Sequence, residues 1–208
     1  MSSITTTHWE TLADQTQIDE TVRALEANGF RTLVVDTAEE ARQAVLDLLP
    51  EGIDVFTAQS MTLNAAGIAE AINESGRYDS VRKKLMGLDR KTQGPEMRKL
   101  GATPSIVVGS VNAVTRQGQV VTASFGGSQL TSYVYGAGKV IWVVGTHKLV
   151  EGLDEALRRI DEYALPLESE RLQKALGVPS AVGKIVIFRK EIVAERVTII
   201  LVKQKLGF

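Results

Sequence analysis

Cysteine is absent from the 208 residues, and histidine occurs only at His8 and His147. The absence of cysteine excludes disulfides, thiol catalysis, cysteine-ligated iron–sulfur clusters and nearly all structural zinc sites. The two histidines lie far apart in the sequence, so no transition-metal site is expected. No motif supports nicotinamide binding, and the sequence predicts neither a metal nor a cofactor.

An excess of charge and a long hydrophobic run are also missing. The chain has 24 basic and 25 acidic residues, a net charge of −1, so no general attraction to nucleic acid or to an anionic membrane is expected. No apolar run is long enough to span a membrane, and the first residues, MSSITTTHWE, lack the basic and apolar regions of a signal peptide. We expect a cytoplasmic protein.

The most informative stretch runs from Ser105 to Val150. It contains two almost uninterrupted apolar runs, 106–108 and 140–144, which end at Gly109 and Gly145. Apolar runs without polar alternation are typical of strands buried on both faces of a parallel sheet that helices cover. The sequence therefore predicts an α/β fold with a mostly parallel central sheet.

The rest of the chain continues this alternation of strands and helices. Strands are expected at 30–35 and 53–56, a single helix at 63–74, and a hairpin around Gln117 and Gly118. Segments 185–188 and 197–202, separated by a charged turn, predict a late antiparallel strand pair. No linker or repeat is visible, so we expect one domain over residues 1–208, with residues 1–13 as an irregular N-terminal arm.

Polar residues follow each buried strand, where ligands bind in open α/β sheets. A small anionic ligand would need a cation, hydrogen-bond donors and a group that moves protons. Lys148 can supply the charge, and His147 is the candidate proton shuttle, so these two are the candidate catalytic residues. The candidate substrate-binding residues are Ser60, Thr62, Ser110, Asn112, Gly126, Gly127, Ser128, Gln129 and Thr146.

Each candidate also has a purely structural interpretation. Ser60 and Thr62 suit the N-terminus of the following helix as caps, and Asn112 suits a turn. His147 suits a loop histidine packed against the end of the sheet. In the helix near residue 156, Arg158 and Arg159 are expected on the face opposite the apolar residues. Glu168 and Arg171 suit an exposed helical pair of little energetic value.

Several segments in a fixed order resemble the LUD-domain family, which is named for lactate utilisation. They are VGSVNAVTRQGQVVTAS, GGSQ, GAGKVIWVVGTHKLV and LDEALRRIDEYALPLESERL, and the likeness extends from about Phe30 to the terminal LVKQKLGF. The resemblance is to short, stand-alone members. It implies a three-layer Rossmann-like sandwich similar to ribose-phosphate isomerases, glucosamine-phosphate deaminases and CoA transferases.

The resemblance leaves three functions open. The first is binding of a small carboxylate, with a part in oxidising lactate to pyruvate. The second is an isomerase or CoA-transferase-like activity on a phosphorylated or thioester substrate. The chain also shows a weaker resemblance to methylthioribose-phosphate isomerases, but it has neither the aspartate nor the cysteine that those enzymes use. The third is a non-catalytic subunit that docks a redox partner protein. A homo-oligomer is expected in each case.

Overall fold

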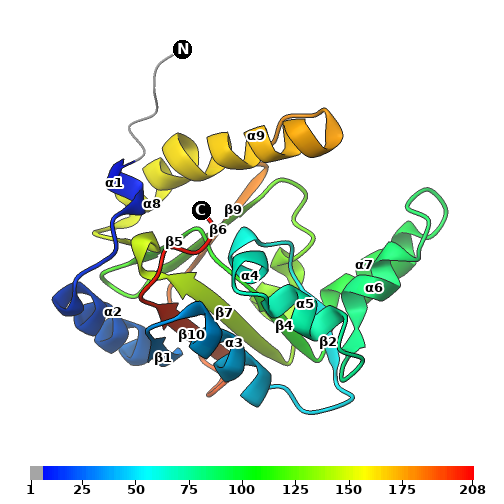
Figure 1. Cartoon of the computed structure of the whole chain (residues 1–208), viewed down its shortest axis with the longest axis horizontal. Helices are drawn as coiled ribbons and strands as arrows, with labels where there is room; N and C mark the ends of the chain where they lie inside the picture. Colours follow the sequence, from blue (N-terminus) through cyan, green and yellow to red (C-terminus); the bar gives the residue numbers. More distant parts are fainter. Residues whose placement is uncertain (1–6) are drawn as a thin grey trace.

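The main sheet has six parallel strands in the order β1-β10-β7-β4-β2-β3 (Figure 1). The structure is a computed structural model that describes residues 7–208. Both predicted central runs are strands, and every residue of β10 is buried. The predicted α/β class with a parallel central sheet is confirmed. The strands are β1 (Arg31–Val35), β2 (Asp54–Thr57), β3 (Asp79–Ser80), β4 (Ile106–Gly109), β7 (Lys139–Gly145) and β10 (Val197–Val202).

A second sheet has the order β8-β5-β6-β9. Strands β5 (Ala113–Thr115) and β6 (Val120–Ser124) form the predicted hairpin, and β8 (Leu149–Val150) runs parallel to β5. Strand β9 (Lys184–Phe188) pairs antiparallel with β6.

The predicted late antiparallel pair is therefore wrong, because β9 and β10 belong to different sheets. Strand β10 lies between β1 and β7 in the main sheet and runs parallel to both. The burial patterns explain the separation. All of β10 is buried, as a central parallel strand requires, whereas β9 exposes Ile185 and Ile187 and packs only Val186 and Phe188 on the core.

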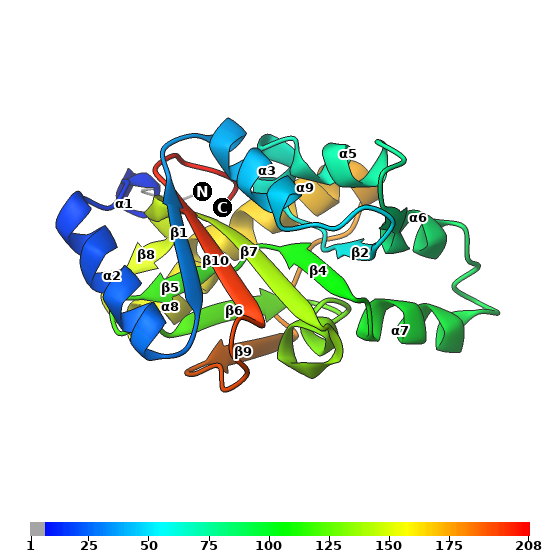
Figure 2. The ribbon, with the colours of Figure 1, turned by 90° about the horizontal axis from the view of Figure 1, so that it is seen from below.

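Helices cover one face of the main sheet, and helices together with the second sheet cover the other (Figure 2). The first face carries α3 (Ala38–Asp47), α4 (Met61–Ala65) and α5 (Ile68–Asn73). The single helix predicted over 63–74 is two helices, because Gly67 between them adopts a left-handed conformation with φ 65°. The second face carries α2 (Gln15–Ala27), α6 (Val81–Met86), α7 (Gly94–Ala102) and the π-helical turn η1 (Ser132–Gly136).

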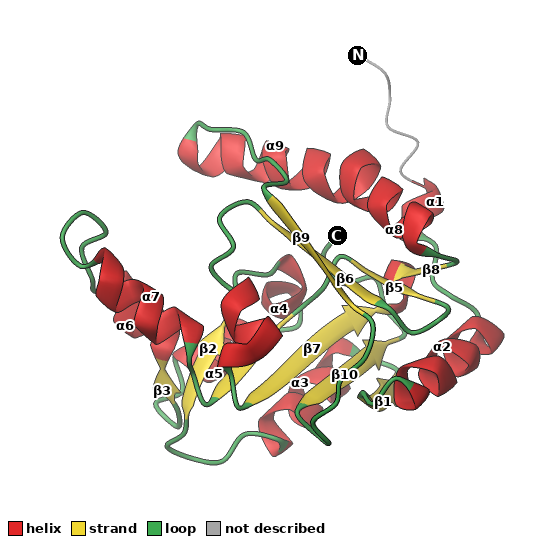
Figure 3. Ribbon diagram, turned by 180° about the vertical axis from the view of Figure 1, so that it is seen from behind, coloured by secondary structure: helices red, strands yellow, loops and turns green. Residues whose placement is uncertain are grey.

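The outer face of the second sheet is covered by α8 (Leu153–Arg159), the π-helical turn η3 (Ile160–Ala164) and α9 (Leu165–Leu176), which are joined end to end (Figure 3). Helix α1 (Thr7–Glu10) joins this layer through Trp9, which is 6% exposed. Of the predicted irregular arm, residues 1–6 lie outside the described residues. The prediction is wrong for α1, because burial of the Trp9 ring fixes that segment to the core.

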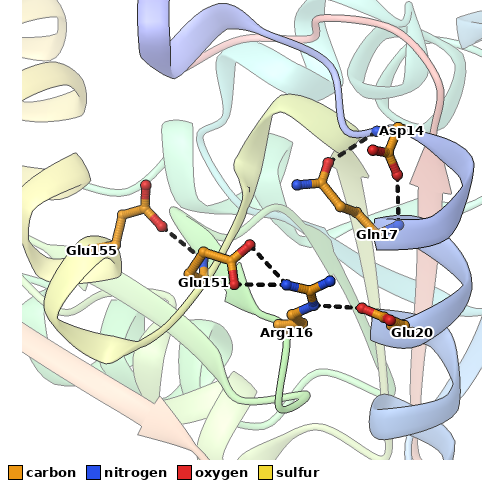
Figure 4. Close-up of polar contacts among 6 residues, drawn as sticks. All are labelled: Asp14, Gln17, Glu20, Arg116, Glu151 and Glu155. Atoms are coloured by element: carbon orange, nitrogen blue, oxygen red, sulfur yellow. Dashed lines mark hydrogen bonds and ion pairs between the residues drawn. The ribbon is translucent and has the colours of Figure 1, made fainter.

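Polar contacts fix α2 against the second sheet (Figure 4). Asp14 and Gln17 form a capping box, in which the Gln17 amide donates to the Asp14 carboxylate at 2.8 Å. Arg116, in the turn between β5 and β6, forms ion pairs with Glu20 of α2 and with Glu151. The Arg116 ion pairs therefore join α2 to the turn between β5 and β6 and to Glu151.

The helices formed by residues 7–208 include none that is both long and apolar enough to cross a membrane.

Candidate functional site

Three loops that leave the carboxyl ends of neighbouring parallel strands meet at one cleft. Ser60 follows β2, Ser110 follows β4, and Lys148 lies in the 3₁₀ turn η2 (Thr146–Lys148) that follows β7. The cleft has a volume of about 520 Å³, and all three residues line it. Since β2, β4 and β7 are adjacent and parallel, their following residues fall at the same edge of the sheet.

Lys148 lies at the inner wall of the cleft with its side chain 1% exposed. Its Nζ lies 3.0 Å from Thr62 Oγ1, 3.2 Å from Ser110 Oγ and 3.2 Å from the Val111 carbonyl oxygen. Thr62 is held in turn, because its hydroxyl donates to the Leu206 carbonyl at 2.9 Å. The structure thus brings together three predicted residues, Lys148, Thr62 and Ser110, around one amine.

No carboxylate among the described residues forms an ion pair with Lys148. Burial, and secondly the positive charge of Arg159, hold the pKa of Lys148 well below its usual value. Both effects disfavour the charged amine, since a buried ammonium loses its hydration and repels a neighbouring cation. Lys148 is therefore a buried amine whose proton is easily removed.

Arg159 is a residue near the site whose environment differs from the one expected from the sequence. It was expected to face solvent, but its side chain is fully buried. One guanidinium nitrogen donates to the Asn112 carbonyl at 2.6 Å, the guanidinium lies 5.0 Å from the centre of the Tyr163 ring, and the remaining two nitrogens have no partner among the described residues. Burial lowers its pKa to about 10, so it stays charged at neutral pH.

A sequence signal for this burial exists. Arg159 lies three residues after Ala156 and four before Tyr163, and helical spacing places these three residues on one face. Ala156 and Tyr163 are both buried. The exposed arginine of the pair is Arg158, which forms an ion pair with Glu162.

His147 and Thr146 precede Lys148 but do not line the cleft. His147 is 2% exposed, and burial, followed by the positive charges of Lys148 and Arg159, lowers its pKa to about 2. A proton shuttle at neutral pH needs a pKa near 7, so the placement of His147 does not suit the predicted role. The Thr146 hydroxyl is buried with no partner among the described residues.

The glycine-containing loop after β6 forms part of the cleft wall. Gly126, Ser128 and Gln129 line the cleft, whereas Gly127 does not. Ser124 organises the loop, because its hydroxyl accepts from the Gly127 amide at 2.9 Å and lies 3.0 Å from the Gln129 side-chain oxygen. Four of the predicted binding residues thus belong to one locally bonded turn, and three of them reach the cleft.

Asn112 and Ser60 line the cleft and also have the structural roles considered for them. The Asn112 side chain accepts a hydrogen bond from the Ala123 amide at 2.7 Å. Asn112 directly precedes β5 and Ala123 lies in β6, so this bond connects the two strands. The Ser60 hydroxyl accepts from the Leu63 amide at 3.3 Å and caps α4.

Helix α9 supplies the outer wall. Glu168 and Arg171 form a bidentate ion pair with two contacts of 2.7 Å, and both line the cleft. Their side chains are only 32% and 25% exposed, so the expectation of an exposed pair is corrected. Arg90 also lines the cleft. The cleft therefore has three basic side chains, Arg90, Lys148 and Arg171, and among the described lining residues only one acidic side chain, Glu168.

Residues 7–208 contain no group of three or more histidine, cysteine, aspartate or glutamate residues placed to hold a metal ion.

A parallel α/β sheet with a polar, cation-rich cleft at its carboxyl edge defines a Rossmann-type protein. The sequence matches the LUD domain over residues 18–202, so the chain belongs to the LUD-domain family, and this membership supports a role related to lactate utilisation. None of the curated proteins matches the sequence.

Two solved structures are similar to this chain to different extents. A DUF162 family protein from Deinococcus radiodurans has a TM-score of 0.57 at 14% identity, and the match covers 92% of this chain and 99% of that one. A ribose 5-phosphate isomerase from Plasmodium falciparum has a TM-score of 0.39 at 12% identity, covering 82% and 94% of the two chains.

Proposed function

We propose that the cleft binds a small carboxylate of the 2-hydroxy acid or 2-oxo acid class, with Lys148 as its principal cationic contact. The observation that carries the proposal is the pair of buried basic side chains, the Lys148 amine and the Arg159 guanidinium, neither of which forms an ion pair among the described residues. Buried charges are costly unless they are compensated, and an anion beside Lys148 would compensate them.

The neighbouring groups favour an anion over a cation. Ser110 and Ser128 place hydroxyl groups in the cleft, and Arg171 and Arg90 place further positive charge at its wall. A bound carboxylate would raise the pKa of Lys148, because an opposite charge favours the ammonium. Binding should therefore be accompanied by proton uptake.

In this proposal the bound carboxylate is lactate or pyruvate. Oxidation of lactate to pyruvate releases two electrons and two protons, so the proposal includes a redox partner protein as electron acceptor. The partner would take up both electrons and both protons, because Lys148 is already protonated when it holds the carboxylate.

The experiment is a thermal-shift titration of the whole chain with lactate, pyruvate, ribose 5-phosphate and CoA. Ligands that bind the folded state raise the melting temperature in a concentration-dependent way. Wild type should respond to lactate or pyruvate. Lys148→Met should bind at least about tenfold more weakly, because a charge-assisted hydrogen bond contributes about 1.5–3 kcal/mol.

Lys139→Met is the matched control, because Lys139 is an exposed lysine at the opposite end of β7. It should respond as wild type does. A response confined to ribose 5-phosphate or CoA would overturn carboxylate binding and favour the isomerase or CoA-transferase class. If none of the four compounds raises the melting temperature, carboxylate binding is also overturned. A non-catalytic subunit of a redox complex would then be the better explanation.

A further inference from the structure

We propose that Ser110 and Lys148 form a nucleophile–base pair that hydrolyses carboxylic esters of small acyl groups. This activity is separate from carboxylate binding. It rests on a serine hydroxyl that lines the cleft and lies 3.2 Å from a buried lysine amine. Serine–lysine pairs of this kind can replace the serine–histidine pair in acyl transfer, because the amine takes the proton as the oxygen attacks.

The three neighbours of Lys148 can all accept from an ammonium, and they also suit a neutral amine, which has two N–H groups and one lone pair. The Val111 carbonyl can only accept. Thr62 must also accept from Nζ, because its own hydrogen is donated to the Leu206 carbonyl at 2.9 Å. These two neighbours use both N–H groups of the neutral amine.

The lone pair of Nζ then remains for the third neighbour, Ser110. Its hydroxyl is able to donate towards Nζ, and its other acceptor within reach, the Val111 carbonyl oxygen, is farther away at 3.5 Å. Of the three neighbours, Ser110 is therefore the one whose proton can pass to Lys148. The deprotonated amine is favoured by the burial and by the nearby charge of Arg159.

Of the titratable groups around the pair, Lys148 is the one suited to act as the base. His147 stays neutral at its own position and lies outside the cleft, while Glu168 is committed to Arg171. Tyr133 lies beneath the pair, 3.4 Å from the Ser110 carbonyl, and burial raises its pKa, so it stays protonated. Arg90 lines the cleft and Arg159 acts on the amine, and both are cationic, while Phe208, which also lines the cleft, carries the terminal carboxylate of the described chain.

The reaction balances without an oxidant or a cofactor. Ser110 Oγ bonds to the acyl carbon as its proton moves to Lys148 Nζ, and the carbonyl oxygen becomes an oxyanion. Collapse of this intermediate breaks the ester C–O bond, and the leaving alkoxide takes the proton from Nζ. Water then attacks acyl-Ser110, gives a proton to Lys148, and releases the carboxylic acid as Ser110 recovers its hydrogen.

The test uses a fluorophosphonate probe, which phosphonylates activated serines with loss of fluoride. Intact-mass and peptide analysis of the wild-type chain should show one label, on Ser110. Ser110→Ala should remove it, and Lys148→Met should slow labelling by at least about 100-fold, the lower end of general-base contributions. Hydrolysis of p-nitrophenyl acetate should follow the same order.

Ser180→Ala is the control, since Ser180 lines the same cleft but makes no hydrogen bond to a lysine among the described residues. Its labelling rate should equal that of wild type. Urea unfolding of each variant shows whether it is folded under the assay conditions. The proposal is overturned if folded wild type is not labelled, if the label lies on another serine, or if folded Lys148→Met is labelled as fast as wild type.

Discussion

Replacing Lys148 by methionine should change the pH dependence of stability more clearly than stability itself. The folded chain holds the pKa of Lys148 well below 10.5, through burial first and the charge of Arg159 second, whereas the unfolded chain restores the ordinary value. Between the two pKa values the unfolded state binds one more proton than the folded state. Stability of wild type therefore rises with pH across this window.

The expected slope between the two pKa values is about 1.4 kcal/mol per pH unit. Lys148→Met has no such group and lacks this contribution. It also loses three hydrogen bonds, to Thr62, Ser110 and the Val111 carbonyl, each worth about 1 kcal/mol. At low pH, the loss of these hydrogen bonds offsets the stability gained because the variant no longer buries an amine. The loss is nearly independent of pH.

Urea unfolding at pH 7 to 10 measures the difference in unfolding free energy between wild type and Lys148→Met. The difference should increase with pH in favour of wild type. Every other titratable side chain is present in both proteins, so the comparison isolates the contribution of Lys148. Lys139→Met should show no slope against wild type. A difference that stays constant from pH 7 to 10 would refute a lowered pKa at Lys148.

Two further substitutions test other parts of the edge of the sheet. The folded chain lowers the pKa of His147 from its ordinary value of 6.5 to about 2. Wild type should therefore lose about 1.4 kcal/mol of stability per pH unit as the pH falls below 6.5, and His147→Gln should abolish that slope in urea unfolding. Equal slopes would contradict this. Gly109→Ala places a methyl group against the Tyr133 hydroxyl and should cost about 1–3 kcal/mol, whereas Gly126→Ala, with open space around it, should change stability little by the same measurement.

The central sheet could be predicted from the sequence because each of its buried strands is marked by a short apolar run of neighbouring residues. The runs before Gly109 and Gly145 are short, apolar and free of alternation, and such runs have few alternatives to a strand buried on both faces. The parallel arrangement then places Ser110 and Lys148 at one edge, although they are 38 residues apart. Their contact follows from topology once the two strands are adjacent.

The errors come from features that depend on partners distant in sequence. The partners of β9 and β10 could not be read from the short connection between them, although the apolar residues 199–202 of β10 already favour a central strand. The burial of Arg159 depends on a carbonyl of Asn112, 47 residues away, and on the continuation of α8 into a π-helical turn. The role of α9 as a cleft wall was hidden because an amphipathic pattern does not say what its face contacts.

The two proposals assign Lys148 opposite protonation states, and one pH series separates them. A carboxylate binds best to the ammonium, so its affinity should fall as pH rises through the pKa of Lys148 in the complex. Acylation of Ser110 requires the neutral amine, so its rate should rise with pH through the pKa in the free protein. Lactate should also slow labelling of Ser110 most at low pH, where it binds best. Labelling that rises with pH while lactate protection stays constant would sustain the nucleophile–base pair and remove Lys148 from carboxylate binding.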